Sequence, residues 1–270
     1  MKKAAFIGSG NMGGALIRAA CRALGPDAVV IADYQPAKAA DLAGELGCTA
    51  AADNRSAAEQ AECVFLCVKP QVLQEVASDL APVLCGRTVV SIAAGVQLET
   101  IKGYLGAAAG EATLLRVMPN TCAAIGQGML ALTAGPEVSE SYYRQVETIL
   151  ACAGRVERLP ESLMDQFTAV AGCGPAFVYQ LIEALADGAV MTGLPRPQAQ
   201  LYAAQTVLGA AAMVLETGRH PGQLKDEVCS PGGSTIAGVA ALERRAFRSA
   251  AIEAVTAAYE KNVALGKPSH

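Results

Sequence analysis

Residues 8–13, Gly-Ser-Gly-Asn-Met-Gly, form the segment best suited to hold a phosphate group. The apolar run Ala4–Gly8 leads into it and the amphipathic stretch Met12–Leu24 follows, so we expect a turn between a strand and a helix. Glycine lets the backbone approach a pyrophosphate, and a helix N-terminus offers free N–H groups and positive potential. The pattern predicts a dinucleotide-binding loop, with a tight turn in an unrelated α/β protein as the alternative. The predicted cofactor-binding residues of this loop are Gly8, Ser9, Gly10, Asn11, Met12 and Gly13.

Asp33 closes the next expected strand, Val29–Asp33, at the position where an acidic side chain commonly accepts from the adenosine ribose hydroxyls. A carboxylate there opposes a 2′-phosphate and favours NADH. Lys38, a few residues on, is within reach of a phosphate, so NADPH and NADH both stay open as cofactors. Tyr34 is included among the predicted cofactor contacts. The alternative for Asp33 is a helix cap, a common role of aspartate.

Small and polar residues also follow the later expected strands of the first half. The carboxyl ends of parallel strands line the ligand crevice of an open sheet, so these residues should meet at one edge. Lys69 could contact a phosphate or ribose there, although a solvated surface lysine is the alternative. The predicted contacts at these strand ends are Val68, Lys69, Pro70, Ala93, Ala94, Gly95 and Asn120.

The turn Cys229–Thr235 is the second segment with the chemistry of a binding site. Its two glycines precede two hydroxyls and the apolar helix expected at Ile236–Leu242. Backbone N–H groups and hydroxyls in such a turn suit a carboxylate, and Ser234 or Thr235 is expected to cap the helix. An ordinary capped helix start is the alternative. The predicted substrate-binding residues here are Ser230, Gly232, Gly233, Ser234 and Thr235.

Apolar runs alternate with amphipathic segments through the first part of the chain, which predicts a doubly wound α/β sheet of the Rossmann type in residues 1–160. We expect the remaining parallel strands at Cys63–Val68, Thr88–Ile92 and Leu114–Val117, with edge strands at Gly128–Ala134 and Arg155–Leu159. The helices expected between them are Pro36–Leu46, Gln71–Leu84, Leu98–Leu105 and Glu140–Cys152.

Residues 161–270 show no strand pattern and are rich in alanine and leucine, which predicts an all-α domain. The expected helices are Glu161–Val170, Pro175–Met191, Pro197–Glu216 and Arg245–Leu265. Alanine lets helices approach closely, so this domain is suited to build a homodimer.

Composition excludes several classes of function. The net charge of −4 gives no basic surface for nucleic acid, and no uninterrupted apolar run is long enough to predict a membrane span. Nine cysteines without a CxxC pair fit a reduced, cytoplasmic compartment. With only two histidines, we expect no metal site and no histidine acid–base pair.

Several motifs follow the glycine loop along the chain, namely Asp53-Asn54, Val68–Gln71, Ala93–Gly95, Arg116–Thr121, Gly172–Ala176, Ala184–Gly188, Gly193–Arg196, His220–Asp226 and Pro231–Thr235. Together with the glycine loop, and in this order, they resemble those of the pyrroline-5-carboxylate reductase family. Cys173 stands where the family usually has serine, and Cys122 where proline commonly follows Asn-Thr.

The resemblance implies an N-terminal Rossmann-like domain and a C-terminal helical domain that interlocks with a partner subunit. Dimers, in some members assembled into decamers, would follow, with NADPH or NADH as hydride donor. By position, Asn54, Val68, Lys69 and Ala94 would contact the cofactor. Glu161, Ser234 and Thr235 would lie around the substrate.

The implied reaction is reduction of the C=N bond of L-1-pyrroline-5-carboxylate to L-proline. Residues 232–235 would hold the substrate carboxylate, and Thr235 would be the catalytic group that hydrogen-bonds the ring nitrogen. A β-hydroxyacid-type dehydrogenase is an alternative, but such enzymes carry a lysine on a second-domain helix, and no lysine lies between Lys102 and Lys225. Another imine reductase and a non-catalytic NAD(P)-sensing protein are further alternatives.

Overall fold

The computed structural model describes residues 1–265, and within them the chain packs as two separate units. The first comprises Met1–Cys173 and the chain from Ala258 onward, and the second comprises Gly174–Ala257. The packing boundary therefore falls later than the expected one at residue 160. Residues 266–270 of the expected second domain lie outside the described part.

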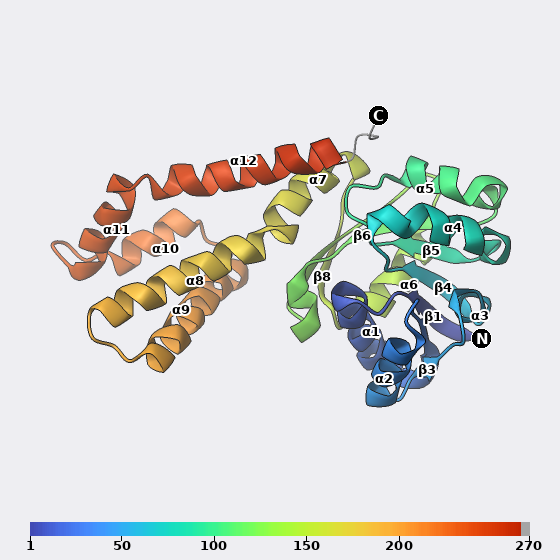
Figure 1. The fold of residues 1–270 in the computed structure, drawn as a ribbon. Helices are drawn as coiled ribbons and strands as arrows, with labels where there is room; N and C mark the ends of the chain where they lie inside the picture. The colour runs from blue at the N-terminus through green and yellow to red at the C-terminus, as the bar shows by residue number, and fades with distance from the viewer. Residues whose placement is uncertain (266–270) are drawn as a thin grey trace. The chain divides into compact units, whose positions relative to one another are not determined.

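An eight-stranded sheet forms the centre of the first unit, in the order β3-β2-β1-β4-β5-β6-β7-β8 (Figure 1). All neighbouring strands are parallel except β6 and β7. This parallel-dominated sheet confirms the predicted Rossmann-like class. The strands are β1 (Lys2–Ile7), β2 (Val29–Ala32), β3 (Thr49–Ala50), β4 (Ala61–Leu66), β5 (Thr88–Ser91), β6 (Thr113–Met118), β7 (Gly128–Ala134) and β8 (Gly154–Arg158).

Helices cover both faces of the sheet, which explains why the central strands are apolar at successive positions rather than at alternate ones. In β1, Phe6 is buried on the face of helix α1 (Asn11–Leu24) and stacks on Phe65 of β4 with ring centroids 4.6 Å apart. Its neighbour Ile7 is buried on the face of α4 (Pro70–Leu84) and α5 (Leu98–Leu105). The helices of this unit are α1 (Asn11–Leu24), α2 (Pro36–Leu46), α3 (Asn54–Glu59), α4 (Pro70–Leu84), α5 (Leu98–Leu105), α6 (Glu140–Leu150) and α7 (Met164–Phe167).

The structure differs from the expected elements in several places. The short elements β3, α3 and α10 (Pro221–Val228) were not predicted, and β7 runs antiparallel to β6. The helix expected at Glu161–Val170 is not a regular one. It consists of the 3₁₀ turn η4 (Glu161–Leu163), then α7, then the π-helix η5 (Thr168–Gly172).

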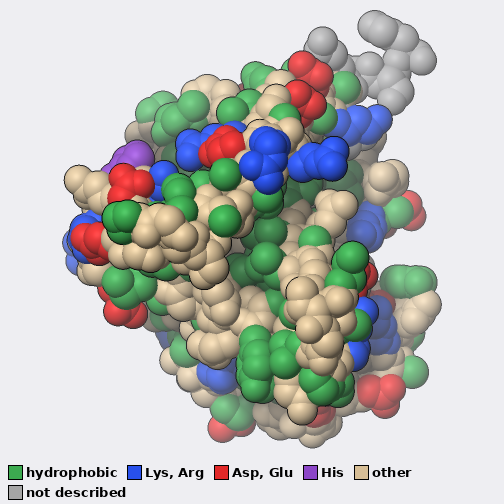
Figure 2. Space-filling view, turned by 90° about the vertical axis from the view of Figure 1, so that its left-hand side faces the viewer, with side chains coloured by type: hydrophobic (Ala, Val, Ile, Leu, Met, Phe, Trp, Pro, Cys, Tyr) green, Lys and Arg blue, Asp and Glu red, His purple; other side chains and the backbone are tan. Residues whose placement is uncertain are grey.

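The second unit is helical, as predicted, and its own core is small. The remaining helices of the chain are α8 (Gly174–Met191), α9 (Arg196–Thr217), α11 (Ser234–Arg244) and α12 (Phe247–Leu265). The buried residues of this core are the alanines Ala186, Ala199 and Ala203, with Ile182 and Leu194 packed against them. Figure 2 shows hydrophobic side chains at the surface, interspersed with charged ones. The exposed large apolar side chains of these helices include Tyr179, Leu185, Met191, Leu201, Tyr202, Leu208, Met213, Leu215, Ile236 and Ile252.

One helical stretch, Glu161–Met191, is long and apolar enough to cross a membrane by length and composition alone. This finding is at odds with the expectation of no candidate span. A helix that packs its apolar side against another chain has the same composition, so the stretch is weak evidence for a membrane segment.

Candidate cofactor and substrate sites

The glycine loop lies between β1 and the N-terminus of α1, as predicted. Gly8 has a φ of +104°, and a Cβ there would lie 2.7 Å from the carbonyl oxygen of Cys67. A Cβ at Gly13 would overlap the carbonyl oxygen of Gly8. No atom lies within 4 Å of the place a Cβ would take at Gly10, which precedes α1 without any side-chain cap. The loop thus combines tight packing beneath it with open space at an uncapped helix N-terminus, the arrangement that accepts a pyrophosphate.

Asp33 lies directly after β2 and is held against the glycine loop. The backbone N–H and hydroxyl of Ser9 donate to its Oδ2 at 2.7 and 2.8 Å, and the Gln35 N–H donates to Oδ1 at 3.0 Å. Partial burial raises the pKa of Asp33, but these hydrogen bonds outweigh it and keep the pKa below its ordinary value. The carboxylate is therefore ionised and fixed beside the loop, and the Ser9 hydroxyl is already engaged.

A cavity of about 770 Å³ opens at the carboxyl ends of β1 and β4. Several predicted contacts line it together, namely Gly8, Tyr34, Asn54, Val68 and Lys69. Asn54 is placed by Asp53, which caps α3 by accepting the Ser56 N–H at 2.7 Å. Pro70 is the first residue of α4 and directs the chain away after Lys69. Sequence reasoning missed Arg55 in the same lining, although its place next to Asn54 was a usable signal.

The loop after β5 contains Ala93, Ala94 and Gly95. Glu161 is hydrogen-bonded to the backbone where this loop ends. The Glu161 carboxylate accepts from the Leu98 N–H at 2.8 Å, where α5 begins, and from Arg116 of β6 at 3.1 Å. The Arg116 side chain is only 3% exposed, whereas that of Glu161 is 27% exposed. The structure thus places Glu161 in the first unit as an ion-pair partner of Arg116. Its predicted contact with the substrate stays a prediction.

Asn120 follows β6 and is buried, with 7% of its surface exposed. Its Nδ2 donates to the Ala171 carbonyl oxygen at 2.9 Å, and its Oδ1 accepts the Met129 N–H at 3.3 Å. Its predicted contact with the cofactor stays a prediction, because the bonds that the amide makes here are both to the protein backbone.

The predicted substrate turn lies between α10 and α11 in the second unit. Gly232 has a φ of +70°, and the Gly233 N–H donates to the Ser230 carbonyl at 3.1 Å. The expectation that Ser234 or Thr235 caps the helix is wrong, because Gly233 occupies the cap position and Ser234 is the first residue of α11. With no side-chain cap, the first N–H groups of α11 are free to bind an anion, and Thr235 is the second residue of this helix.

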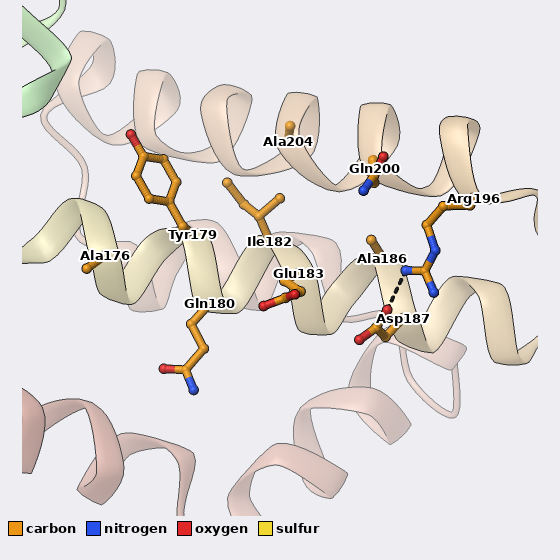
Figure 3. A pocket seen from close by; sticks show the side chains of 10 residues that line it. All are labelled: Ala176, Tyr179, Gln180, Ile182, Glu183, Ala186, Asp187, Arg196, Gln200 and Ala204. Carbon is orange, nitrogen blue, oxygen red and sulfur yellow. Dashed lines mark hydrogen bonds and ion pairs between the residues drawn. The ribbon is translucent and has the colours of Figure 1, made fainter.

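A larger hollow of about 900 Å³ lies along α8 and α9 of the second unit (Figure 3). Tyr179 and Ile182 of α8 line it beside Ala204 of α9, and Arg196 forms an ion pair with Asp187 at one end. None of the predicted site residues lines this hollow. Its apolar lining instead fits the expected association of these helices with another chain.

Comparison with known proteins gives a consistent result over nearly the whole chain. Residues 161–265 match the family model for pyrroline-5-carboxylate reductase dimerisation, and residues 3–95 match that of the coenzyme F420-dependent NADP oxidoreductases. A pyrroline-5-carboxylate reductase of Synechocystis sp. is 44% identical over 265 residues, covering 97% of each chain. That of Escherichia coli is 42% identical over 269 residues, covering 98% of this chain and 99% of the relative.

Solved structures agree with these relatives. A pyrroline-5-carboxylate reductase from Coxiella burnetii matches with a TM-score of 0.90 and 32% identity, over 99% of each chain. A pyrroline carboxylate reductase from Plasmodium falciparum with NADP bound matches with a TM-score of 0.87 and 29% identity, over 98% of each chain.

Proposed function

Because the chain belongs to the pyrroline-5-carboxylate reductase family, and so reduces L-1-pyrroline-5-carboxylate to L-proline with NAD(P)H in proline biosynthesis, we propose roles for the residues of its two sites. The observation that carries the assignment of the cofactor site is the glycine loop, whose open, uncapped helix N-terminus adjoins a cavity lined by polar strand ends. In this proposal residues 1–160 form the cofactor domain and residues 161–270 the substrate and dimerisation domain.

The glycine loop holds the pyrophosphate of the cofactor through the N–H groups at the start of α1. Asn54, Val68 and Lys69 line the cavity beside it, with a cation and an amide for the ribose or phosphate groups. The small residues Ala93–Gly95 leave room for a flat ring to lie close to the backbone. When bound, the nicotinamide cofactor is the source of the hydride that reduces the C=N carbon.

The turn at residues 230–235 binds the substrate carboxylate. The free N–H groups at the start of α11 and the hydroxyl of Ser234 supply the donors. Thr235 hydrogen-bonds the ring nitrogen and orients the C=N bond, and its hydroxyl passes the proton that converts the imine to the protonated imine before the carbon accepts hydride. Since a protonated imine is already electrophilic, positioning contributes more to this reaction than a strong acid.

We further propose that the second unit forms a homodimer through its exposed apolar helices, and that dimers assemble into decamers. The exposed apolar side chains of α8 and α9 and the hollow between these helices support association. The enzyme acts in the cytoplasm on a small molecule, with neither nucleic acid nor a membrane as partner. The net charge of −4 and nine cysteines that form no disulfide support this location.

The first experiment is cofactor oxidation by the purified protein with pyrroline-5-carboxylate, run in parallel with NADPH and NADH. Turnover with either cofactor supports the assignment, and the ratio of the two rates gives the preference. If the cofactor binds but neither is oxidised, the protein is a sensor or acts on another imine.

Thr235→Ala should lower kcat by about 10²- to 10⁴-fold, the usual contribution of a positioned proton donor. Thr235→Ser is the matched control, because it keeps the hydroxyl and should keep most of the rate. If cofactor affinity falls as much as kcat in Thr235→Ala, the role assigned to Thr235 is refuted.

A further inference from the structure

The helical segment that leads from the first unit into the second is irregular at one place. In the π-helix η5, the Cys173 N–H donates to the Thr168 carbonyl five residues back, at 2.9 Å. The boundary between the two packing units follows at once, between Cys173 and Gly174. Single turns of π-helix are often found at functional sites.

Pro175 explains why the helix is irregular there. In a regular α-helix, the N–H of residue 175 would donate to the carbonyl oxygen of Ala171. Proline has no N–H, and its ring would clash with that carbonyl, so the helix must open. The Ala171 carbonyl is therefore left without its helical donor.

Asn120 supplies the missing donor from outside the helix. Its Nδ2 lies 2.9 Å from the Ala171 oxygen, and its Oδ1 accepts the N–H of Met129 in β7. One buried amide thus ties the end of β6, the start of β7 and the opened helix together. The next residue, Gly172, sits so close to the sheet that a Cβ there would lie 3.2 Å from the Met118 side chain.

We propose that Asn120 is a positioning residue for hydride transfer, which acts by replacing the hydrogen bond that Pro175 cannot make. The bond fixes the helix at Ala171, close to the end of the cofactor-binding unit at Cys173. This inference rests on the proposed function, because hydride transfer requires the bound substrate to reach the nicotinamide.

The test compares four proteins, namely wild type, Asn120→Asp, Pro175→Ala and the double variant. Asn120→Asp keeps the acceptor for Met129 and replaces the donor to Ala171 with an oxygen that carries negative charge, so the double variant reports how much of the loss is due to the missing donor. Pro175→Ala supplies a backbone N–H that can bond Ala171, so it makes the Asn120 donor dispensable. We expect Asn120→Asp to lower kcat about tenfold, a factor that corresponds to about 1.4 kcal/mol, within the range for one hydrogen bond.

Two further readouts separate positioning from cofactor binding. The dissociation constant of the cofactor, measured by calorimetry, should stay within about twofold of wild type in Asn120→Asp. The deuterium isotope effect on kcat, measured with cofactor labelled at the transferred position, should rise because hydride transfer becomes slower relative to the other steps. In the double variant, kcat should return to within about threefold of that of Pro175→Ala.

An equal loss of kcat with proline or alanine at residue 175 would overturn the proposal. So would a cofactor dissociation constant that rises as much as kcat falls, since Asn120 would then contact the cofactor as its sequence position predicts. If Asn120→Asp does not fold, a double variant that folds and keeps kcat within about threefold of that of Pro175→Ala supports the proposal, and failure of both variants to fold overturns it. If wild type shows no turnover, the proposed function fails, and the unfolding midpoints of the four proteins decide whether the two residues are coupled.

Discussion

Replacing Glu161 with alanine tests whether the buried guanidinium of Arg116 depends on its ion pair with this carboxylate. Arg116 is 3% exposed, and Glu161 is its partner in the described structure, at 3.1 Å. Its Nε is buried without any hydrogen-bond partner in this part of the chain. Glu161→Ala would leave this cation uncompensated and would also free the Leu98 N–H at the start of α5.

The expected cost follows from these exposures. Breaking a fully buried ion pair by removing one partner costs about 3–5 kcal/mol. Glu161 is 27% exposed, so water can partly replace its carboxylate, and we expect a loss of about 2–3 kcal/mol in the free energy of unfolding. Glu161→Gln keeps an oxygen for Leu98 but no charge for Arg116, and should fall between wild type and Glu161→Ala.

Urea unfolding followed by circular dichroism measures the loss. Glu137→Ala is the matched control, because Glu137 pairs with Lys102 at 3.3 Å on the surface and should contribute less than about 1 kcal/mol. If Glu161→Ala costs no more than this control, the ion pair does not stabilise the buried guanidinium, and the reasoning is refuted. If the loss appears only in the KM for pyrroline-5-carboxylate, Glu161 contacts substrate as its position in the family predicts.

Two other predictions concern the glycine loop. Gly13→Ala should abolish measurable cofactor binding in calorimetry while the protein stays folded, because the new Cβ would overlap the Gly8 carbonyl and displace the loop. Wild-type cofactor affinity in this variant would refute the close packing of Gly13 on Gly8. The pKa of Asp33 is lowered on folding, so its contribution to stability is present above about pH 3.9, the ordinary value, and is lost as pH falls through the folded-state pKa. Unfolding midpoints between pH 2 and 6 should therefore fall less steeply in Asp33→Asn than in wild type, and parallel curves would contradict this.

The central strands could be predicted from the sequence because helices cover both faces of the sheet. Burial on both sides makes each strand a short apolar run, such as Val29–Ala32, and its limits were predicted to within two residues. The elements β3 and α3 were missed because they are short and contain few large apolar side chains. The direction of β7 was readable in principle, since the connection from Met118 to Gly128 is too short for the crossover that a parallel strand needs.

The residues of the candidate sites also fall into a group that the sequence could predict and a group that it could not. Asn54, Val68 and Lys69 could be predicted because strand ends of a parallel sheet meet at one edge. The partners of Asn120 and Glu161 could not, because each bonds to a residue far away in the sequence, Ala171 and Arg116 respectively. No local pattern reports such partners. Pro175 was expected to begin a helix, Pro175–Met191, so it gave no sign that the Ala171 carbonyl would lack a helical donor.

The alanine core of the second unit has a consequence for how the enzyme is made in the cell. Methyl groups of Ala186, Ala199 and Ala203 bury little apolar area, so the isolated helices gain little free energy from packing on each other. Most of the free energy that stabilises this unit must come when the exposed side chains of α8 and α9 pack against another chain. The stability of this unit then depends on protomer concentration. Newly synthesised chains at low abundance would be targets for proteolysis until they pair, so the cellular level of the enzyme would respond more than linearly to its rate of synthesis.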